Sequence, residues 1–118
     1  MIQKVNNNGD NLRKNNITFF ENAYSSAVKE GMKILGEDVS KIVQDYIEDK
    51  YSFQIENTSQ DPKSLSEALQ FVIDGGKRII ERRIIRILSK KIEIEYHSAE
   101  LINFEKQIKE MRKSFEDI

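Results

Sequence analysis

Residues 77–92 constrain the fold more than any other segment, because their apolar side chains recur at helical spacing on one side. These side chains span an arc of roughly 160° on a helical wheel, and they are Ile80, Ile84, Ile85, Ile87, Leu88 and Ile92. The other side carries basic residues at successive i+4 steps, which we call the basic face: Arg78, Arg82, Arg86 and Lys90. A helix with one apolar side must bury that side, so the sequence predicts helices packed on helices.

A first helix is predicted to begin at Thr18, because Thr18 and Glu21 match a capping box. It is predicted to end at Gly36, in the left-handed conformation that glycine adopts easily. Small residues recur at every fourth position within it, at Ala23, Ala27 and Gly31. Such a strip of small residues lets a second helix approach closely.

Two further helices are predicted before the glycine pair at residues 75–76. The second helix carries Glu37 and Asp38 in its first turn, where the helix dipole favours anions. Its predicted apolar stripe consists of Val39, Ile42, Val43, Tyr46 and Ile47. The third helix begins at Asp61 and Pro62, which suit the N-cap and first helical positions. Its predicted buried residues are Leu65, Leu69, Val72 and Ile73, while the position of Phe71 stays open.

The predicted fold is all-α, with a compact four-helix domain at residues 17–92 and an extended C-terminal heptad helix at residues 93–118. Residues 1–16 are rich in asparagine and poor in apolar side chains, so they are predicted to form a disordered tail. The heptad positions repeat with 3-4 spacing at Leu101, Phe104, Ile108, Met111, Phe115 and Ile118. Two interpretations fit this repeat: a self-association surface, with Leu101 to Phe115 as its contacts, or a helix that folds back on its own domain.

Composition excludes several classes of function. The chain has no cysteine and a single histidine, so thiolate zinc sites, disulfides and a conventional catalytic triad are excluded. We therefore expect no enzymatic activity, no cofactor and no metal. No apolar run approaches the roughly 18 residues of a membrane span, and the N-terminus lacks the apolar segment of a signal peptide. A cytoplasmic location without a membrane partner is the resulting expectation.

The motif Gly75, Gly76, Lys77 and Arg78 admits two interpretations. Glycines and free amides at a helix N-terminus allow a phosphate to come close. Alternatively, Gly75 ends the third helix and Gly76 gives the chain room to turn, which is the interpretation we favour. The basic face also admits two interpretations. It could bind a phosphate backbone or an acidic partner, or it is solvated and partly paired with acids of the second helix.

Glu81 falls inside the apolar arc of its helix. A carboxyl group in that position must be paired, hydrogen-bonded or protonated, because burying a bare charge is costly. Catalysis would require a second convergent group, and the sequence shows none. We therefore interpret Glu81 as a buried polar residue that accepts a structural hydrogen bond.

Several short features follow one another between residues 19 and 92: LG at 35–36, Tyr46, Tyr51, Pro62, SEAL at 66–69, the glycine pair and IIE at 79–81. This order resembles the small archaeal all-helical output domain named from Nitrosopumilus signalling proteins (NitrOD-type). The resemblance implies an output role in archaeal signalling and carries no catalytic residues. We expect a non-enzymatic interaction module with a protein partner or a second copy. The alternative is a nucleic-acid-binding regulator that uses the basic helix 77–91.

Overall fold

Helices make up all the regular structure of residues 9–73, 75–94 and 103–116, which are the residues described by a computed structural model. In chain order the elements are α1 (Gly9–Met32), η2 (Lys33–Leu35), α2 (Glu37–Tyr51), η3 (Ile55–Asn57), α3 (Pro62–Val72), α4 (Lys77–Ile92) and α5 (Phe104–Glu116), where η denotes a short 3-10 helix. The all-α prediction is therefore confirmed for this part of the chain.

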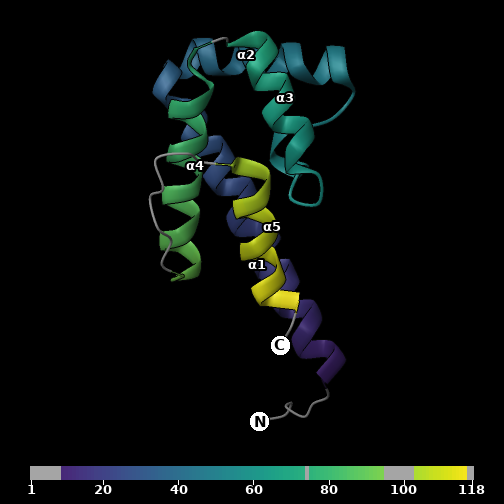
Figure 1. Ribbon diagram of the computed structural model, residues 1–118. Helices are drawn as coiled ribbons and strands as arrows, with labels where there is room; N and C mark the ends of the chain where they lie inside the picture. The colour runs from purple at the N-terminus through teal and green to yellow at the C-terminus, as the bar shows by residue number, and fades with distance from the viewer. Residues whose placement is uncertain (1–8, 74, 95–102, 117–118) are drawn as a thin grey trace.

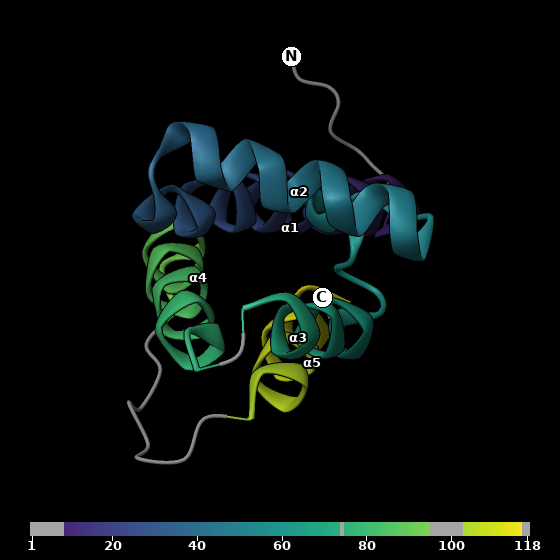
Figure 2. The same cartoon turned by 90° about the horizontal axis from the view of Figure 1, so that it is seen from above.

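Helix α1 is central to the fold, because both α4 and α5 pack against it (Figure 1). Seen from above, α4 stands on one side of the molecule and α3 lies with α5 on the other (Figure 2). The strip of small residues on α1 is buried. At Gly31 the approach of α4 is so close that an added Cβ would lie 2.6 Å from Cγ1 of Ile84. The predicted use of this strip is therefore confirmed at Gly31.

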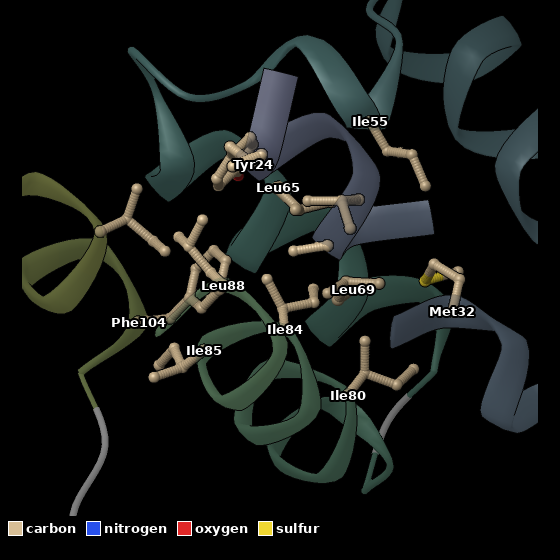
Figure 3. Close-up of a cluster of buried hydrophobic side chains, with 14 of the residues drawn as sticks. Tyr24, Met32, Ile55, Leu65, Leu69, Ile80, Ile84, Ile85, Leu88 and Phe104 are labelled. Atoms are coloured by element: carbon tan, nitrogen blue, oxygen red, sulfur yellow. The ribbon is translucent and has the colours of Figure 1, made fainter. Parts of the chain in front are cut away.

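The hydrophobic core forms where α1, α3, α4 and α5 converge (Figure 3). Its largest fully buried side chains include Tyr24, Met32, Ile55, Leu65, Leu69, Ile80, Ile84, Ile85, Leu88 and Ile108. Helix α4 contributes most of the apolar arc that the sequence predicted, although Ile87 is only partly buried. Helix α2, in contrast, buries only Ser40 and Ile47.

The start of α1 corrects two predictions. Residues 9–16 were assigned to the disordered tail, but α1 begins at Gly9, and residues 1–8 lie outside the described part of the chain. Thr18 lies inside α1 and is not its N-cap, so the capping box is wrong. Extending an existing helix adds one hydrogen bond per residue, and asparagine weakens a helix by well under about 1 kcal/mol. Glu21 instead pairs with Arg112 of α5, at 3.2 Å.

Gly36 has a positive φ, but its conformation is not the predicted left-handed helical one. Its φ of 88° and ψ of 155° lie in a region that is essentially open only to glycine. The residue ends η2 and starts α2, because its carbonyl accepts a hydrogen bond from the Ser40 amide at 2.9 Å. Glu37 and Asp38 then occupy the first turn of α2, as predicted.

Helix α5 packs against α1, α3 and α4 within the same chain. Three of its heptad side chains are buried in the core: Phe104, Ile108 and Met111. Phe115 packs on Phe19 and Phe20, with ring centroids 5.9 and 5.4 Å apart. The assignment of these four residues to self-association is therefore corrected, because they bind their own domain, and Leu101 lies outside the described residues. A 3-4 repeat marks one apolar side of a helix and does not say which chain covers it.

Tyr24 anchors the η3 region to α1 by a buried hydrogen bond. Its hydroxyl lies 2.7 Å from Oγ1 of Thr58, which itself donates to the Ile55 carbonyl at 2.8 Å. Since the single hydroxyl proton of Thr58 is used there, Tyr24 must be the donor. Burial raises the pKa of Tyr24 far above its usual value, so the hydroxyl keeps the proton that it donates.

Tyr24→Phe is expected to lower the free energy of unfolding by about 1 kcal/mol, because it removes a buried hydrogen bond and keeps the ring. Urea denaturation measures the change. Tyr46→Phe is the matched control, since Tyr46 is 47% exposed and the loss of its hydroxyl should change stability by less than about 0.5 kcal/mol. Equal effects at both positions would contradict the role given to the Tyr24 hydroxyl.

Candidate functional site

A polar pocket of about 620 Å³ opens between α3, the start of α4 and the start of α5. Helix α3 contributes Lys63 and Ser66, which stand one turn apart. The turn before α4 and its first two turns contribute Gly75, Lys77, Arg78 and Glu81, and the start of α5 contributes Asn103, Phe104 and Glu105. The pocket thus brings Glu81 together with Gly75, Lys77 and Arg78 of the glycine motif and with Phe104 of the heptad repeat.

Glu81 forms part of the pocket wall and is only 3% exposed. Its Oε2 accepts a hydrogen bond from Oγ of Ser66, at 2.7 Å. Burial raises the pKa of Glu81, while the Ser66 hydrogen bond and the charges of Lys77 and Arg78 act in the opposite direction. The structure thus places Glu81 where the helical wheel puts it, with a serine as its donor. The sequence did not identify this donor, because no local spacing links Ser66 to Glu81.

Glu81→Gln is expected to stabilise the protein increasingly as the pH rises. A carboxyl group with a raised folded-state pKa contributes stability below its unfolded pKa of about 4.3, and that stability is lost as the pH rises through the folded-state pKa. Glutamine cannot ionise and still accepts from Ser66. The free energy of unfolding is measured in urea from about pH 4 to about pH 8. The value for Glu81→Gln minus the value for wild type should increase with rising pH. A difference that shrinks with rising pH would contradict this assignment.

The glycine pair lies in the corner between α3 and α4, as we favoured from the sequence, but α3 already ends at Val72 with Ile73 as its C-cap, so Gly75 does not end that helix. Gly75 has a φ of 85°, and the Gly76 amide donates to the Ile73 carbonyl at 2.8 Å. Gly76 is the N-cap of α4 and makes no side-chain cap hydrogen bond. The first backbone amides of α4, which lie next to the pocket, therefore receive no hydrogen-bond acceptor from the side chain of the N-cap residue. A tight corner between two helices and an anion-binding turn can be formed by the same residues, so the two interpretations of the glycine pair do not exclude each other.

The basic face lies on the outside of α4, and all four of its residues are exposed. Only Arg78 also lines the pocket; Arg82, Arg86 and Lys90 are not among its lining residues. Arg83 and Lys91, which flank this face, are tied to α1, where they contact Glu30 at 3.3 Å and 3.0 Å.

The expected pairing of the basic face with the acids of α2 is wrong for Arg78, Arg86 and Lys90. None of the three forms an ion pair within the residues that the structure describes, and the α2 carboxylate of Asp45 pairs with Lys41 of the same helix instead, at 3.5 Å. The reason is geometric, because the basic face lies on the side of α4 away from the core.

A second candidate site is an exposed patch that we call the α2 apolar surface, formed by Val39, Ile42, Tyr46 and Phe71. Their side chains are exposed by 49%, 66%, 47% and 72%. The Lys50 ammonium links its two parts, lying 5.7 Å from the Tyr46 ring centroid and 4.6 Å from that of Phe71. The prediction that Val39, Ile42 and Tyr46 face inward is therefore wrong, because α2 buries the side marked by Ile47 and Ser40.

Protein-family models, curated proteins and solved structures all lack a match to this chain, so the NitrOD-type resemblance stays a prediction. Among the described residues, no helix is long and apolar enough to cross a membrane. In the same residues, no group of three or more His, Cys, Asp or Glu side chains is placed to hold a metal ion. His97 lies outside the part of the chain that is described.

Proposed function

We propose that this protein is a non-enzymatic interaction module that self-associates, with the α2 apolar surface of one copy docking on the basic face of another. The observation that carries the proposal is the exposure of four large apolar side chains at the α2 apolar surface. Single exposed apolar residues are ordinary on a monomer, whereas a group of neighbouring ones is typical of an interaction site.

Charge determines which partner suits this surface. Asp38, Asp45 and Asp49 recur along α2 next to its apolar side chains, at spacings that keep them on one side of the helix. All three are exposed. A complementary partner therefore needs an apolar centre with basic residues around it. Two α2 apolar surfaces facing each other would set acids against acids, which is unfavourable.

The basic face of α4 has these properties. Ile79 is 55% exposed and shares the outer side of the helix with Arg86 and Lys90, because the three stand at i, i+7 and i+11. Arg86 and Lys90 form no ion pair within the described residues, so both charges are available to a second copy. Copies that contact each other through two different surfaces form either a closed assembly, such as a pair or a ring, or an open chain.

Ile42→Glu is expected to weaken self-association at least about tenfold, because it introduces a carboxylate at the centre of an apolar contact. Sedimentation velocity over a range of protein concentrations measures the effect. Thr18→Glu is the matched control, since it adds the same charge at an exposed position of α1 and should leave association unchanged. Association should also weaken with rising salt. A wild-type protein that stays monomeric at high concentration would contradict the proposal.

We propose that this association serves output in archaeal signalling or regulation, which is what the NitrOD-type resemblance implies, in the cytoplasmic location expected from the sequence. The exposed basic face also supports the alternative of a nucleic-acid-binding regulator. The two functions respond differently to the same pair of variants. Arg86→Glu should weaken either activity, whereas Ile42→Glu should weaken self-association and leave a gel shift at low salt unchanged.

A further inference from the structure

We propose that the pocket between α3, α4 and α5 binds a small phosphate-bearing anion, and that Glu81 takes up a proton when the anion binds. The pocket is lined by none of the four residues of the α2 apolar surface, and of the basic face only Arg78 lines it. A volume of about 620 Å³ is within the range of small-molecule sites.

The cationic side chains of the pocket are the first argument. Lys63 comes from α3, and Lys77 and Arg78 come from the first turn of α4. None of the three forms an ion pair within the residues that the structure describes. The facing carboxylate of Glu105 is bound by Lys109 at 2.8 Å, so its charge is already compensated. Among the described side chains that line the pocket, positive charge is therefore in excess, which favours an anion and disfavours a cation.

The start of α4 is the second argument. This helix has 16 residues, and its N-cap glycine offers no side-chain acceptor to its first amides. Gly75, immediately before it, lines the same pocket, where the absence of a side chain lets a ligand approach the backbone. Partial positive charge at a helix N-terminus adds to the field of the three cationic side chains.

A phosphate group fits this set of donors better than a carboxylate does. It offers several strong acceptor oxygens and carries close to two negative charges near neutral pH. The pocket offers two ammonium groups, a guanidinium and the backbone at Gly75. The hydroxyl of Ser66 is already used by Glu81, so it is not counted as a donor to the ligand.

Glu81 makes the binding dependent on pH. Its carboxyl group lies in the pocket wall, so an ionised Glu81 repels a bound anion, and protonation removes that repulsion. The groups that face it are Lys63 and Ser66 from α3, Lys77 and Arg78 from α4, Glu105 from α5, and Tyr24 from α1. Burial already raises the pKa of Glu81, so protonation at the moment of binding costs less than it does for an exposed glutamate. By linkage, a bound anion raises this pKa further.

The test is titration calorimetry of the full chain with pyrophosphate and with sulfate. Sulfate keeps a constant charge across the pH range used, so any pH dependence with this probe belongs to the protein. Wild type should bind both anions. Lys77→Ala combined with Arg78→Ala should weaken binding at least about tenfold, since two charges are removed. Lys113→Ala, which removes an exposed charge outside both the pocket and the basic face, should change affinity less than about twofold.

Glu81→Gln tests the proton uptake. At neutral pH this variant should bind sulfate about tenfold more tightly than wild type, and its affinity should not change between about pH 5 and pH 8, whereas wild-type affinity should fall over that range. Absence of binding by wild type at millimolar anion would overturn the proposal. An equal loss in the Lys113→Ala variant would overturn the pocket as the site, and identical pH profiles for wild type and Glu81→Gln would overturn the proton uptake.

Discussion

Ile108→Ala is expected to lower the free energy of unfolding by about 2–5 kcal/mol without changing the association state. Ile108 is fully buried, and α5 packs against α1, α3 and α4 of its own chain. Truncating this side chain loses its transfer free energy and leaves a cavity that the surrounding helices fill only in part. Urea denaturation, at a protein concentration below that of self-association, measures the loss.

The same variant distinguishes the two interpretations of the heptad repeat. If α5 formed an intermolecular coiled coil, Ile108→Ala would chiefly reduce the sedimenting mass and would hardly affect the stability of the monomer. Lys106→Ala is the matched control on the same helix, because Lys106 is exposed and its replacement should change stability by less than about 0.5 kcal/mol. Loss of association with unchanged monomer stability would contradict the fold-back arrangement.

Gly31→Ala is expected to destabilise the protein by about 1–3 kcal/mol, although alanine is the better helix former by about 1 kcal/mol. The added Cβ would lie 2.6 Å from Cγ1 and 3.4 Å from the backbone nitrogen of Ile84. Either the Ile84 side chain must leave its position in the core or α4 must move away from α1. Thermal or urea unfolding measures the cost.

A double-mutant cycle isolates this contact. Ile84→Ala removes Cγ1 and on its own costs about 2–5 kcal/mol, because Ile84 is fully buried. In the Ile84→Ala background, Gly31→Ala should be neutral or stabilising, since the clash is gone and only the gain in helix propensity is left. A penalty for Gly31→Ala that is the same in both backgrounds would show that the clash with Ile84 is not its cause.

Local sequence signals predicted the helices well where one side of a helix is apolar and its ends carry clear residues. Helix α4 was expected at about residues 77–92, and it runs from Lys77 to Ile92. Pro62 starts α3 as expected. Glu81 was expected to be buried, because its neighbours on the helical wheel are isoleucines and a leucine. In each case the information lies within one helix.

Apart from the start of α1 and the conformation of Gly36, the predictions that failed depended on which elements meet. Helix α2 has apolar residues on two adjoining sides, and the sequence does not show that the fold covers only the side of Ile47. The repeat in α5 fits a partner helix of any chain, and only the packing shows that α1 of the same chain supplies it. The pocket joins Lys63 and Ser66 of α3 to residues of α4 and α5, and no spacing along the chain encodes that meeting.

Mixing two variants that each lose self-association tests the central claim most directly. Ile42→Glu has a damaged α2 apolar surface and an intact basic face, whereas Arg86→Glu has the reverse, and the intact surfaces of the two variants can still dock on each other. Sedimentation velocity should therefore show each variant as a monomer alone and a heavier species in the equimolar mixture. A mixture that sediments like its separate components would contradict docking of the α2 apolar surface on the basic face.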